Sequence, residues 1–264
     1  MTSRDPNLAP LNPFKLALAE GRVQTGIWQG LTSPEAVTIC ADAGFDWLLL
    51  DAEHSPNDLA MLRSQLVAMQ ASDTHAIVRP PLGETWMIKQ VLDLGVQTVL
   101  VPMIDTAEQA RDMVLACRYP PEGKRGVGSA LARASNYGRR KGYLNSANEQ
   151  ICLLVQVETK LALENLDEIL QVEGVDGVFI GPADLSSDMG FRGQPDAPEV
   201  RAAISDAITR IAAAGKAPGI LLGDPAWLQQ SVDEGALFLG VGNDVAMLVQ
   251  ASTALAAQAQ ALKK

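Results

Sequence analysis

The stretch VDGVFIGPADLSS, residues 175–187, shows the pattern on which the fold prediction depends. Its apolar run 178–180 lies between two glycines, which predicts a short, buried strand. Gly181-Pro182 ends this strand, and Asp184 follows at a position where a helix could begin. In an α/β barrel, a carboxylate just past the carboxyl end of a strand lies on the face where active sites are built. The plainer interpretation is that Asp184 only caps the helix, as aspartate often does.

Apolar runs alternate with helical stretches over the rest of the chain. Most of these runs are continuously apolar, which is typical of parallel strands covered on both faces. Strands are expected at residues 25–29, 47–51, 76–79, 98–102, 152–158, 177–180, 218–222 and 237–241. Helices are expected at residues 33–43, 57–70, 84–94, 106–117, 160–170, 197–214 and 225–234. This order predicts an α/β protein with a (β/α)8 TIM barrel. A doubly wound open sheet is the alternative, because periodicity alone does not show closure.

Two further helices are expected to flank the barrel. Residues 13–20 form a short amphipathic pattern that ends at Gly21, and residues 1–11 before it are expected to be flexible. The last helix, 244–262, carries an apolar stripe that is expected to contact another subunit. The stripe consists of Leu248, Ala251, Leu255, Ala259 and Leu262. Residues 1–264 are expected to form a single catalytic domain, because 264 residues suit one such barrel.

Composition excludes several classes of partner. Hydrophobic residues make up 47% of the chain, charged residues make up 20%, and the formal net charge is −10. This negative charge argues against nucleic acid or an anionic membrane as a partner. No apolar run approaches the length of a membrane span, and the amino terminus lacks the apolar core of a signal peptide. The cysteines form no CxxC pair, so we expect reduced thiols and a cytoplasmic protein.

One connection is much longer than the others. It covers residues 118–150, RYPPEGKRGVGSALARASNYGRRKGYLNSANEQ, and we call it the insert. Its basic residues are Arg118, Lys124, Arg125, Arg133, Arg139, Arg140 and Lys141. Long loops in compact domains are usually functional or disordered. The insert is therefore either a lid or interface segment facing an anionic substrate, or a solvated loop packed on a neighbouring subunit. The two interpretations are compatible.

Polar residues gather at the expected carboxyl ends of the strands. The second strand leads into Asp51-Ala52-Glu53-His54, and the third ends at Arg79. A histidine flanked by carboxylates at a strand end suits a general base near neutral pH, although a lone histidine is usually structural. Arg79 at the end of an apolar strand needs an anionic partner. That partner is either Asp51 or Glu53, or an oxyanion of the substrate. His75 precedes the third strand, so we expect a structural role on the opposite face.

Two more strand ends carry carboxylates. The fifth strand ends in Gln156-Val157-Glu158, and the sixth leads to Asp184. Two carboxylates at neighbouring strand ends can hold one hard divalent cation. With no histidine cluster, they suit zinc poorly and Mg²⁺, Mn²⁺ or Co²⁺ better, with water and substrate completing the coordination shell.

The sequence lacks the residues that several other reaction mechanisms require. No lysine lies inside an expected strand, which disfavours a Schiff base. There is also no GxSxG elbow, and the run GKRGVGS is not a P-loop.

Longer motifs extend these observations to a known family. They are GIWQG (26–30), FDWLLLDAEHSPND (45–58), VRP (78–80), IKQVLDLGVQTVLVPM (88–103), RYPPEGKRGVGSALARAS (118–135), LLVQVET (153–159), VEGVDGVFIGPADLSSDMG (172–190), GKAPGIL (215–221) and GALFLGVGNDVAML (235–248). These motifs resemble those of the HpcH/HpaI aldolases, from about residue 12 to the carboxyl terminus. The resemblance implies a (β/α)8 barrel and a divalent-metal-dependent (class II) pyruvate aldolase. Such an enzyme reversibly cleaves a 4-hydroxy-2-oxo acid, such as 4-hydroxy-2-oxoheptanedioate, to pyruvate and an aldehyde, such as succinate semialdehyde.

The resemblance also implies roles for individual residues and an assembly. Glu158 and Asp184 would ligate the metal, Mg²⁺, Mn²⁺ or Co²⁺. The keto acid would contact Gln156, Ala183 through its backbone, and Asp184. The implied assembly is a homo-oligomer, a hexamer, and the implied setting is the catabolism of aromatic compounds.

The catalytic residues follow from the same resemblance. Arg79 would stabilise the enolate, His54 would accept the proton, and Asp93 would raise the basicity of His54. Asp93 falls near the far end of the expected helix 84–94, so a neighbouring subunit would have to supply it, and Asp51 is the local alternative. Ala52 departs from the family, because many relatives have glycine before the Glu-His pair.

Three alternatives stay open from the sequence. The chain could be a sibling aldolase for 2-keto-3-deoxy sugar acids, such as 2-keto-3-deoxy-rhamnonate or -glucarate. A citrate-lyase-β-like enzyme for CoA thioesters would need a CoA-binding surface, and no such surface is apparent in the sequence. A catalytically inactive barrel that serves in assembly is disfavoured, because all the motif residues are present.

Overall fold

The structure is a computed structural model that describes residues 5–263. Within this range, eight parallel strands close into one barrel, and each strand pairs with its neighbours in chain order. The strands are β1 Gln24–Gln29, β2 Trp47–Asp51, β3 His75–Arg79, β4 Thr98–Val101, β5 Cys152–Val157, β6 Gly177–Ile180, β7 Ala217–Leu221 and β8 Phe238–Asn243. The predicted (β/α)8 barrel is thus confirmed, and the open sheet is excluded because β1 pairs with β8.

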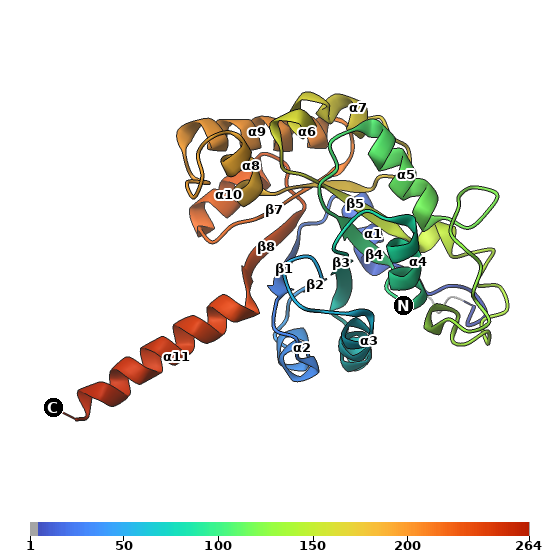
Figure 1. Ribbon diagram of the computed structural model, residues 1–264, viewed down its shortest axis with the longest axis horizontal. Coiled ribbons are helices and arrows are strands. Elements are labelled where there is room, and N and C mark those ends of the chain that lie inside the picture. Colours follow the sequence, from blue (N-terminus) through green and yellow to red (C-terminus); the bar gives the residue numbers. More distant parts are fainter. Residues whose placement is uncertain (1–4, 264) are drawn as a thin grey trace.

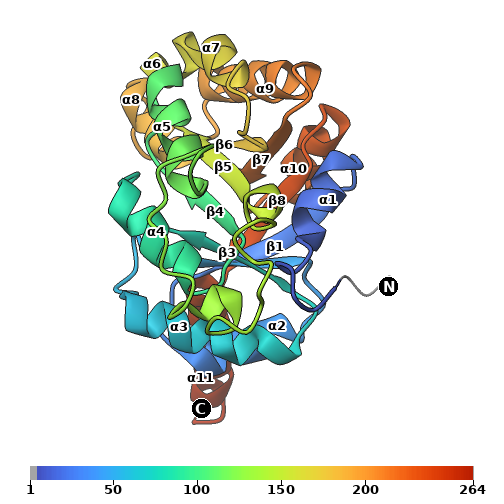
Figure 2. The ribbon, with the colours of Figure 1, turned by 90° about the vertical axis from the view of Figure 1, so that its right-hand side faces the viewer.

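The helices are α1 Pro13–Ala19, α2 Pro34–Ala41, α3 Leu59–Ala68, α4 Thr85–Asp93, α5 Ala107–Cys117, α6 Lys160–Glu164, α7 Leu166–Leu170, α8 Pro182–Asp188, α9 Pro198–Ala213, α10 Pro225–Asp233 and α11 Asp244–Ala261. Helices α2 to α10 surround the barrel on its outer face, whereas α1 lies at its amino end and α11 extends away from it (Figures 1 and 2). Capping side chains begin many of them, because the first backbone N–H groups of a helix lack partners within it. Ser33 caps α2, Asp58 caps α3, and Thr106 forms a capping box with Gln109 at α5.

Two apolar layers hold the barrel together. The larger layer lies between the strands and the surrounding helices, and the smaller layer fills the barrel interior. Phe14 and Leu18 of α1 belong to the interior layer, so α1 closes the amino end of the barrel. Gly26 of β1 lies beside Trp47 of the neighbouring strand β2, and a Cβ at position 26 would overlap the indole ring. Glycine is therefore required where the large ring fills the interior.

The described helices differ from the prediction at two places. The expected helix 160–170 is divided at Asn165, which ends α6 and begins α7. The side chain of Asn165 donates to the Asp105 carbonyl, 2.8 Å away, and so ties this break to the preceding loop. The helix that could begin at Asp184 is present as α8, but it begins at Pro182.

The insert lies at the amino end of the barrel. It leaves the carboxyl end of α5 and returns at the start of β5, and its only regular structure within residues 118–150 is two short 3-10 turns, Arg133–Ser135 and Asn148–Gln150. Gly142 N donates to Asn7 O at 2.9 Å, and Ala9 N donates to Ser146 Oγ at 2.8 Å. The insert therefore lies away from the catalytic face of its own barrel, because a helix-to-strand connection emerges on the opposite face.

The segment 1–11 was expected to be flexible. Residues 1–4 lie outside the described part of the chain. Residues 5–11 contact the insert through the Asn7 and Ala9 hydrogen bonds.

The last helix leaves the barrel. Figure 1 shows α11 extending away from the other elements towards the carboxyl terminus. Its apolar side chains are exposed, with Leu248 at 57% and Leu255 at 66%. A free apolar helix face of this kind normally marks an interaction site. No helix among residues 5–263 is both long enough and apolar enough to cross a membrane.

Candidate active site

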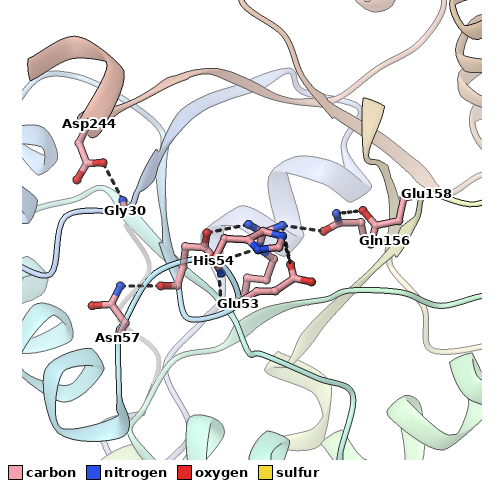
Figure 3. A network of polar contacts seen from close by, with 9 residues as sticks. Gly30, Glu53, His54, Asn57, Gln156, Glu158 and Asp244 are labelled. Atoms are coloured by element: carbon pink, nitrogen blue, oxygen red, sulfur yellow. Dashed lines mark hydrogen bonds and ion pairs between the residues drawn. The ribbon is translucent and has the colours of Figure 1, made fainter. Parts of the chain in front are cut away.

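Polar side chains from several elements meet at the carboxyl end of the barrel (Figure 3). Asp51 and Arg79 end β2 and β3, where they are direct partners in the strand register. Gln156 lies on β5, and Glu158 follows that strand at once. Asp184 lies in the first turn of α8. Closure of the barrel thus brings the strand-end residues of the sequence prediction to one face.

Arg79 and Asp51 form a buried, forked ion pair. Arg79 Nε donates to Asp51 Oδ1 at 2.9 Å, and Nη2 donates to Oδ2 at 2.7 Å. Arg79 Nη1 lies 2.8 Å from Glu53 Oε2. The anionic partners of Arg79 in this structure are therefore both of the carboxylates that the sequence offered. This geometry fixes the plane of the guanidinium and leaves one edge facing Gln156 Oε1, 3.5 Å away.

His54 lies on the loop after β2, beside this ion pair. The backbone N–H groups of Glu53 and His54 donate to Asp51 Oδ1 at 3.0 and 3.5 Å. The His54 side chain is 65% exposed, and its Nε2 lies 3.7 Å from Glu53 Oε2. Burial raises the pKa of Glu53, although the charges of Arg79 and His54 lower it in part. The loop therefore presents an accessible imidazole next to a held carboxylate.

Glu158 is a buried carboxylate with few donors. Its Oε2 accepts from Gln156 Nε2, and its Oε1 accepts from Met103 N at 3.0 Å. The pKa of Glu158 is raised to about 7, mainly by burial and also by the negative charges of Asp184 and Glu53. The two hydrogen bonds only partly offset these effects. Among residues 5–263, no salt bridge joins the Glu158 carboxylate to a positive side chain, although the charge of Arg79 acts on it from nearby.

The donor set fits one divalent cation. Asp184 and Glu158 supply carboxylate oxygens from adjacent elements, which hard cations prefer. No group of three or more His, Cys, Asp or Glu among residues 5–263 could hold a metal, so further ligands would have to be water and substrate. Mg²⁺, Mn²⁺ and Co²⁺ tolerate such a shell, whereas structural zinc does not.

Gly181 makes room for this arrangement. A Cβ at position 181 would overlap Glu158 Oε2 and would lie 3.0 Å from Gln156 Nε2. The backbone of Gly181, with φ −94° and ψ 96°, is open to any residue, so the close approach of Glu158 is what requires glycine here. Gly181 also precedes the first residue of α8, where no side chain caps the helix. The capping interpretation of Asp184 is therefore wrong.

Sequence comparison gives an independent result. Residues 24–251 match the family model described as HpcH/HpaI aldolase/citrate lyase.

The chain belongs to this family. The family resemblance stated from the motifs is thus confirmed, and the protein is a carbon–carbon lyase. A hydroxypyruvate/pyruvate aldolase of Deinococcus radiodurans is 58% identical over 95% of this chain and 91% of the relative. A 4-hydroxy-2-oxo-heptane-1,7-dioate aldolase of Shigella sonnei is 53% identical over 94% of each chain. The crystal structure of a family protein from Burkholderia cenocepacia J2315 superposes with a TM-score of 0.90 at 35% identity, covering 94% of this chain and 99% of that one.

Asp93 is the candidate residue of this aldolase that the structure separates from the site. It is the last residue of α4, and its Oδ1 accepts from Arg125 Nη2 at 2.7 Å. Arg125 is fully buried and stacks over the Tyr119 ring, 4.3 Å from its centroid. Asp93 therefore holds the insert in its own subunit and does not touch its own His54. Asp51, the local alternative, contacts the His54 backbone.

Two residues that contact the candidate site were absent from the sequence prediction. Met103 follows β4 and has a left-handed backbone, φ 56°, which turns its N–H towards Glu158. Such strain is found mainly at functional sites. Trp28 of β1 lies under the Arg79 guanidinium, 5.9 Å from ring centroid to Cζ. The position of Trp28 on the inner face of β1 was readable from strand periodicity, whereas the left-handed Met103 had no local signal. Ala183, the predicted backbone contact, lies beside Asp184 in α8 and is exposed.

Proposed function

We propose that this lyase is a divalent-metal-dependent class II aldolase for 4-hydroxy-2-oxo acids. It would reversibly cleave such an acid to pyruvate and an aldehyde. The observation that carries the proposal is the buried Glu158, close enough to Asp184 and to Arg79 of the Arg79–Asp51 pair for their charges to interact. An unbalanced carboxylate next to a fixed guanidinium can hold a cation and an anionic keto acid together.

Glu158 and Asp184 would hold the cation, which supplies Lewis acidity to a bound 2-oxo acid. Mg²⁺, Mn²⁺ and Co²⁺ all match these ligands. Gln156 is 3% exposed and donates to Glu158, so it orients that carboxylate and also faces the substrate space. The Ala183 backbone and Asp184, in the first turn of α8, would contact the keto acid.

Arg79 would stabilise the enolate oxygen of the donor. Asp51 and Glu53 hold its guanidinium in place before substrate arrives. A hydrogen-bonding group that is already oriented needs little reorganisation during the reaction, and this is its main advantage in catalysis.

His54 would accept and return the proton. Its exposure leaves the imidazole free to reach a substrate directly or through one water. The Asp51 carboxylate fixes the loop that carries His54 by accepting from its backbone N–H groups. Asp93 would raise the basicity of His54 from a neighbouring subunit, because its own subunit keeps it at Arg125.

The names of two relatives suggest two candidate substrates. The Shigella sonnei relative is called a 4-hydroxy-2-oxo-heptane-1,7-dioate aldolase, which corresponds to release of pyruvate and succinate semialdehyde. The Deinococcus radiodurans relative is called a hydroxypyruvate/pyruvate aldolase, so hydroxypyruvate is a second candidate donor. Both names favour an aldolase over a lyase for CoA thioesters. The acid 4-hydroxy-2-oxoheptanedioate suits a role in the catabolism of aromatic compounds.

We also propose a homo-oligomer, a hexamer, in the cytoplasm. The exposed apolar face of α11 supports a contact with another copy of the chain. Three buried, free cysteines are compatible with a reducing compartment.

The decisive experiment measures pyruvate release from 4-hydroxy-2-oxoheptanedioate. Enzyme stripped with EDTA should be inactive and should recover with Mg²⁺, Mn²⁺ or Co²⁺. A parallel assay follows exchange of the pyruvate methyl protons with D₂O by NMR, without any aldehyde. His54→Ala should slow this exchange by roughly 10²–10⁴-fold while metal and pyruvate still bind. Borohydride trapping of pyruvate on a lysine would refute the metal-dependent mechanism.

A further inference from the structure

A pair of buried amides lies directly behind the catalytic loop. Asn57 is 6% exposed and Gln65 is fully buried in α3. Asn57 Nδ2 donates to the Asp51 carbonyl at 2.6 Å (Figure 3). Gln65 Nε2 donates to Asn57 Oδ1 at 3.2 Å and to Leu31 O at 3.4 Å. These side chains form a clamp that joins α3 to the end of β2 and to the loop after β1.

Packing alone does not explain the clamp. Gln65 Oε1 is buried and finds no hydrogen-bond partner in the described part of the chain. A buried polar atom without a partner costs free energy that an apolar side chain of the same size would avoid. The hydrogen bonds that Gln65 Nε2 donates, rather than the volume of the side chain, are therefore what explains a glutamine at this position.

The clamp acts on the residue that organises the catalytic groups. The Asp51 carboxylate receives both arms of the Arg79 fork and the backbone N–H groups of Glu53 and His54. A shift of the Asp51 backbone would therefore move the guanidinium and the imidazole together. Asn57 fixes the Asp51 carbonyl, and Gln65 fixes the orientation of Asn57.

We infer that Asn57 and Gln65 are positioning residues for the aldolase reaction, which set the geometry of Asp51, Arg79 and His54 without touching substrate. This inference rests on the proposed function.

The same network continues to the base of α11. Asp244 is the first residue of α11 and is 4% exposed. Its Oδ1 accepts from Gly30 N at 2.7 Å, and its Oδ2 accepts from Leu31 N at 3.0 Å. Leu31 O accepts in turn from Gln65. The clamp therefore links the catalytic loop to Asp244, at the start of α11.

The test compares Gln65→Leu, Asn57→Ala and the double variant with the wild type. Gln29→Leu is the matched control, because Gln29 is also a fully buried amide whose side-chain atoms have no partner among the described residues. Gln29 belongs to the face of β1 that carries Ile27 of the outer core, away from the barrel interior. Each protein is measured for pyruvate methyl exchange in D₂O, for KM of pyruvate, for Mn²⁺ affinity and for urea unfolding.

The clamp predicts a specific pattern. Gln65→Leu and Asn57→Ala should each lower the maximal exchange rate about tenfold to a hundredfold. KM for pyruvate and Mn²⁺ affinity should stay within about twofold. Gln65→Leu should remain folded without urea but unfold at a lower urea concentration, because Asn57 Oδ1 and Leu31 O lose the donor. The double variant should be little slower than the worse single variant, because both changes break one chain of contacts. Gln29→Leu should exchange at the wild-type rate.

Two results would overturn the clamp while the proposed function stands. One is wild-type exchange in Gln65→Leu and Asn57→Ala when His54→Ala is slow. The other is a rate that falls only in proportion to Mn²⁺-binding capacity or to the folded fraction, which would indicate a structural role. Absence of exchange in the wild type itself would instead refute the proposed function, and the clamp with it.

Discussion

Gly181→Ala tests the metal site with the smallest possible change. The new Cβ would overlap Glu158 Oε2 and would lie 3.0 Å from both Glu158 Cβ and Gln156 Nε2. Carbon atoms in contact prefer about 3.5–4.0 Å. The Glu158 side chain would therefore have to move by about 0.5–1 Å. Because its Cβ is among the crowded atoms, rotation of the carboxylate alone would not relieve the overlap.

This movement should weaken metal binding and slow the reaction. Glu158 would lose alignment with Met103 N, now 3.0 Å from Oε1, and with Gln156. Displaced supporting groups typically cost 10–100-fold in metal affinity, and about 1 Å of misplacement can cost about 10²-fold in rate. We expect Mn²⁺ affinity to fall at least about tenfold and pyruvate methyl exchange at saturating metal to fall about tenfold to a hundredfold.

The assay pairs Gly181→Ala with Gly223→Ala. Gly223 lies between β7 and α10, also after the carboxyl end of a strand, and a Cβ there would meet nothing within 4 Å. Calorimetric titration with Mn²⁺ and NMR exchange in D₂O are measured on both variants, with circular dichroism as the check on folding. Wild-type Mn²⁺ affinity in a folded Gly181→Ala protein would refute the assignment of Glu158 as a ligand. Equal losses in the two variants would show that the effect is not local.

Three further predictions concern other parts of the molecule. Arg79→Lys should slow pyruvate methyl exchange about a hundredfold, because lysine cannot keep both bonds to Asp51; an unchanged rate by NMR would contradict the role of the fork. Burial lowers the pKa of His75 from 6.5 to about 4. Between these two pH values the unfolded chain binds more protons than the folded chain, so His75 costs the folded protein up to about 3 kcal/mol of stability as the pH falls through this range. His75→Gln should therefore gain stability relative to wild type between pH 7 and pH 4.5 in urea unfolding, and a difference independent of pH would contradict this. Leu248→Glu with Leu255→Glu should dissociate the oligomer in light scattering, because both exposed side chains lie on α11; an unchanged mass would exclude this face as the contact.

Much of the fold was readable from local patterns. Short apolar runs separated by amphipathic helices are consistent only with strands that are covered on both sides, and the order of the runs led to the barrel. The strand boundaries agree within about two residues, because the turn and capping signals are themselves local. The placement of His75 at the amino end of β3 followed from its order in the chain alone.

The carboxyl-end residues were also predictable as a set. Parallel strands in a closed barrel bring all their carboxyl ends to one face, so residues far apart in the sequence had to meet there. Asp51 and Arg79 are the clearest case, since a register match of β2 and β3 places them side by side.

Only the tertiary structure decided the contacts that depend on side-chain packing across elements. The Asp93–Arg125 pair, the left-handed Met103 and the amide pair of Asn57 and Gln65 each join segments whose spacing carries no periodic signal. The direction of α11 likewise has no local determinant, because an apolar stripe indicates that a face will be buried but not against which surface. Sequence by itself therefore determined which elements form and which ends of strands carry the polar side chains, since both follow from short-range periodicity and chain direction. Closure of the barrel and packing of its loops decided which of those groups touch, because contact energies depend on distances that only the folded chain sets.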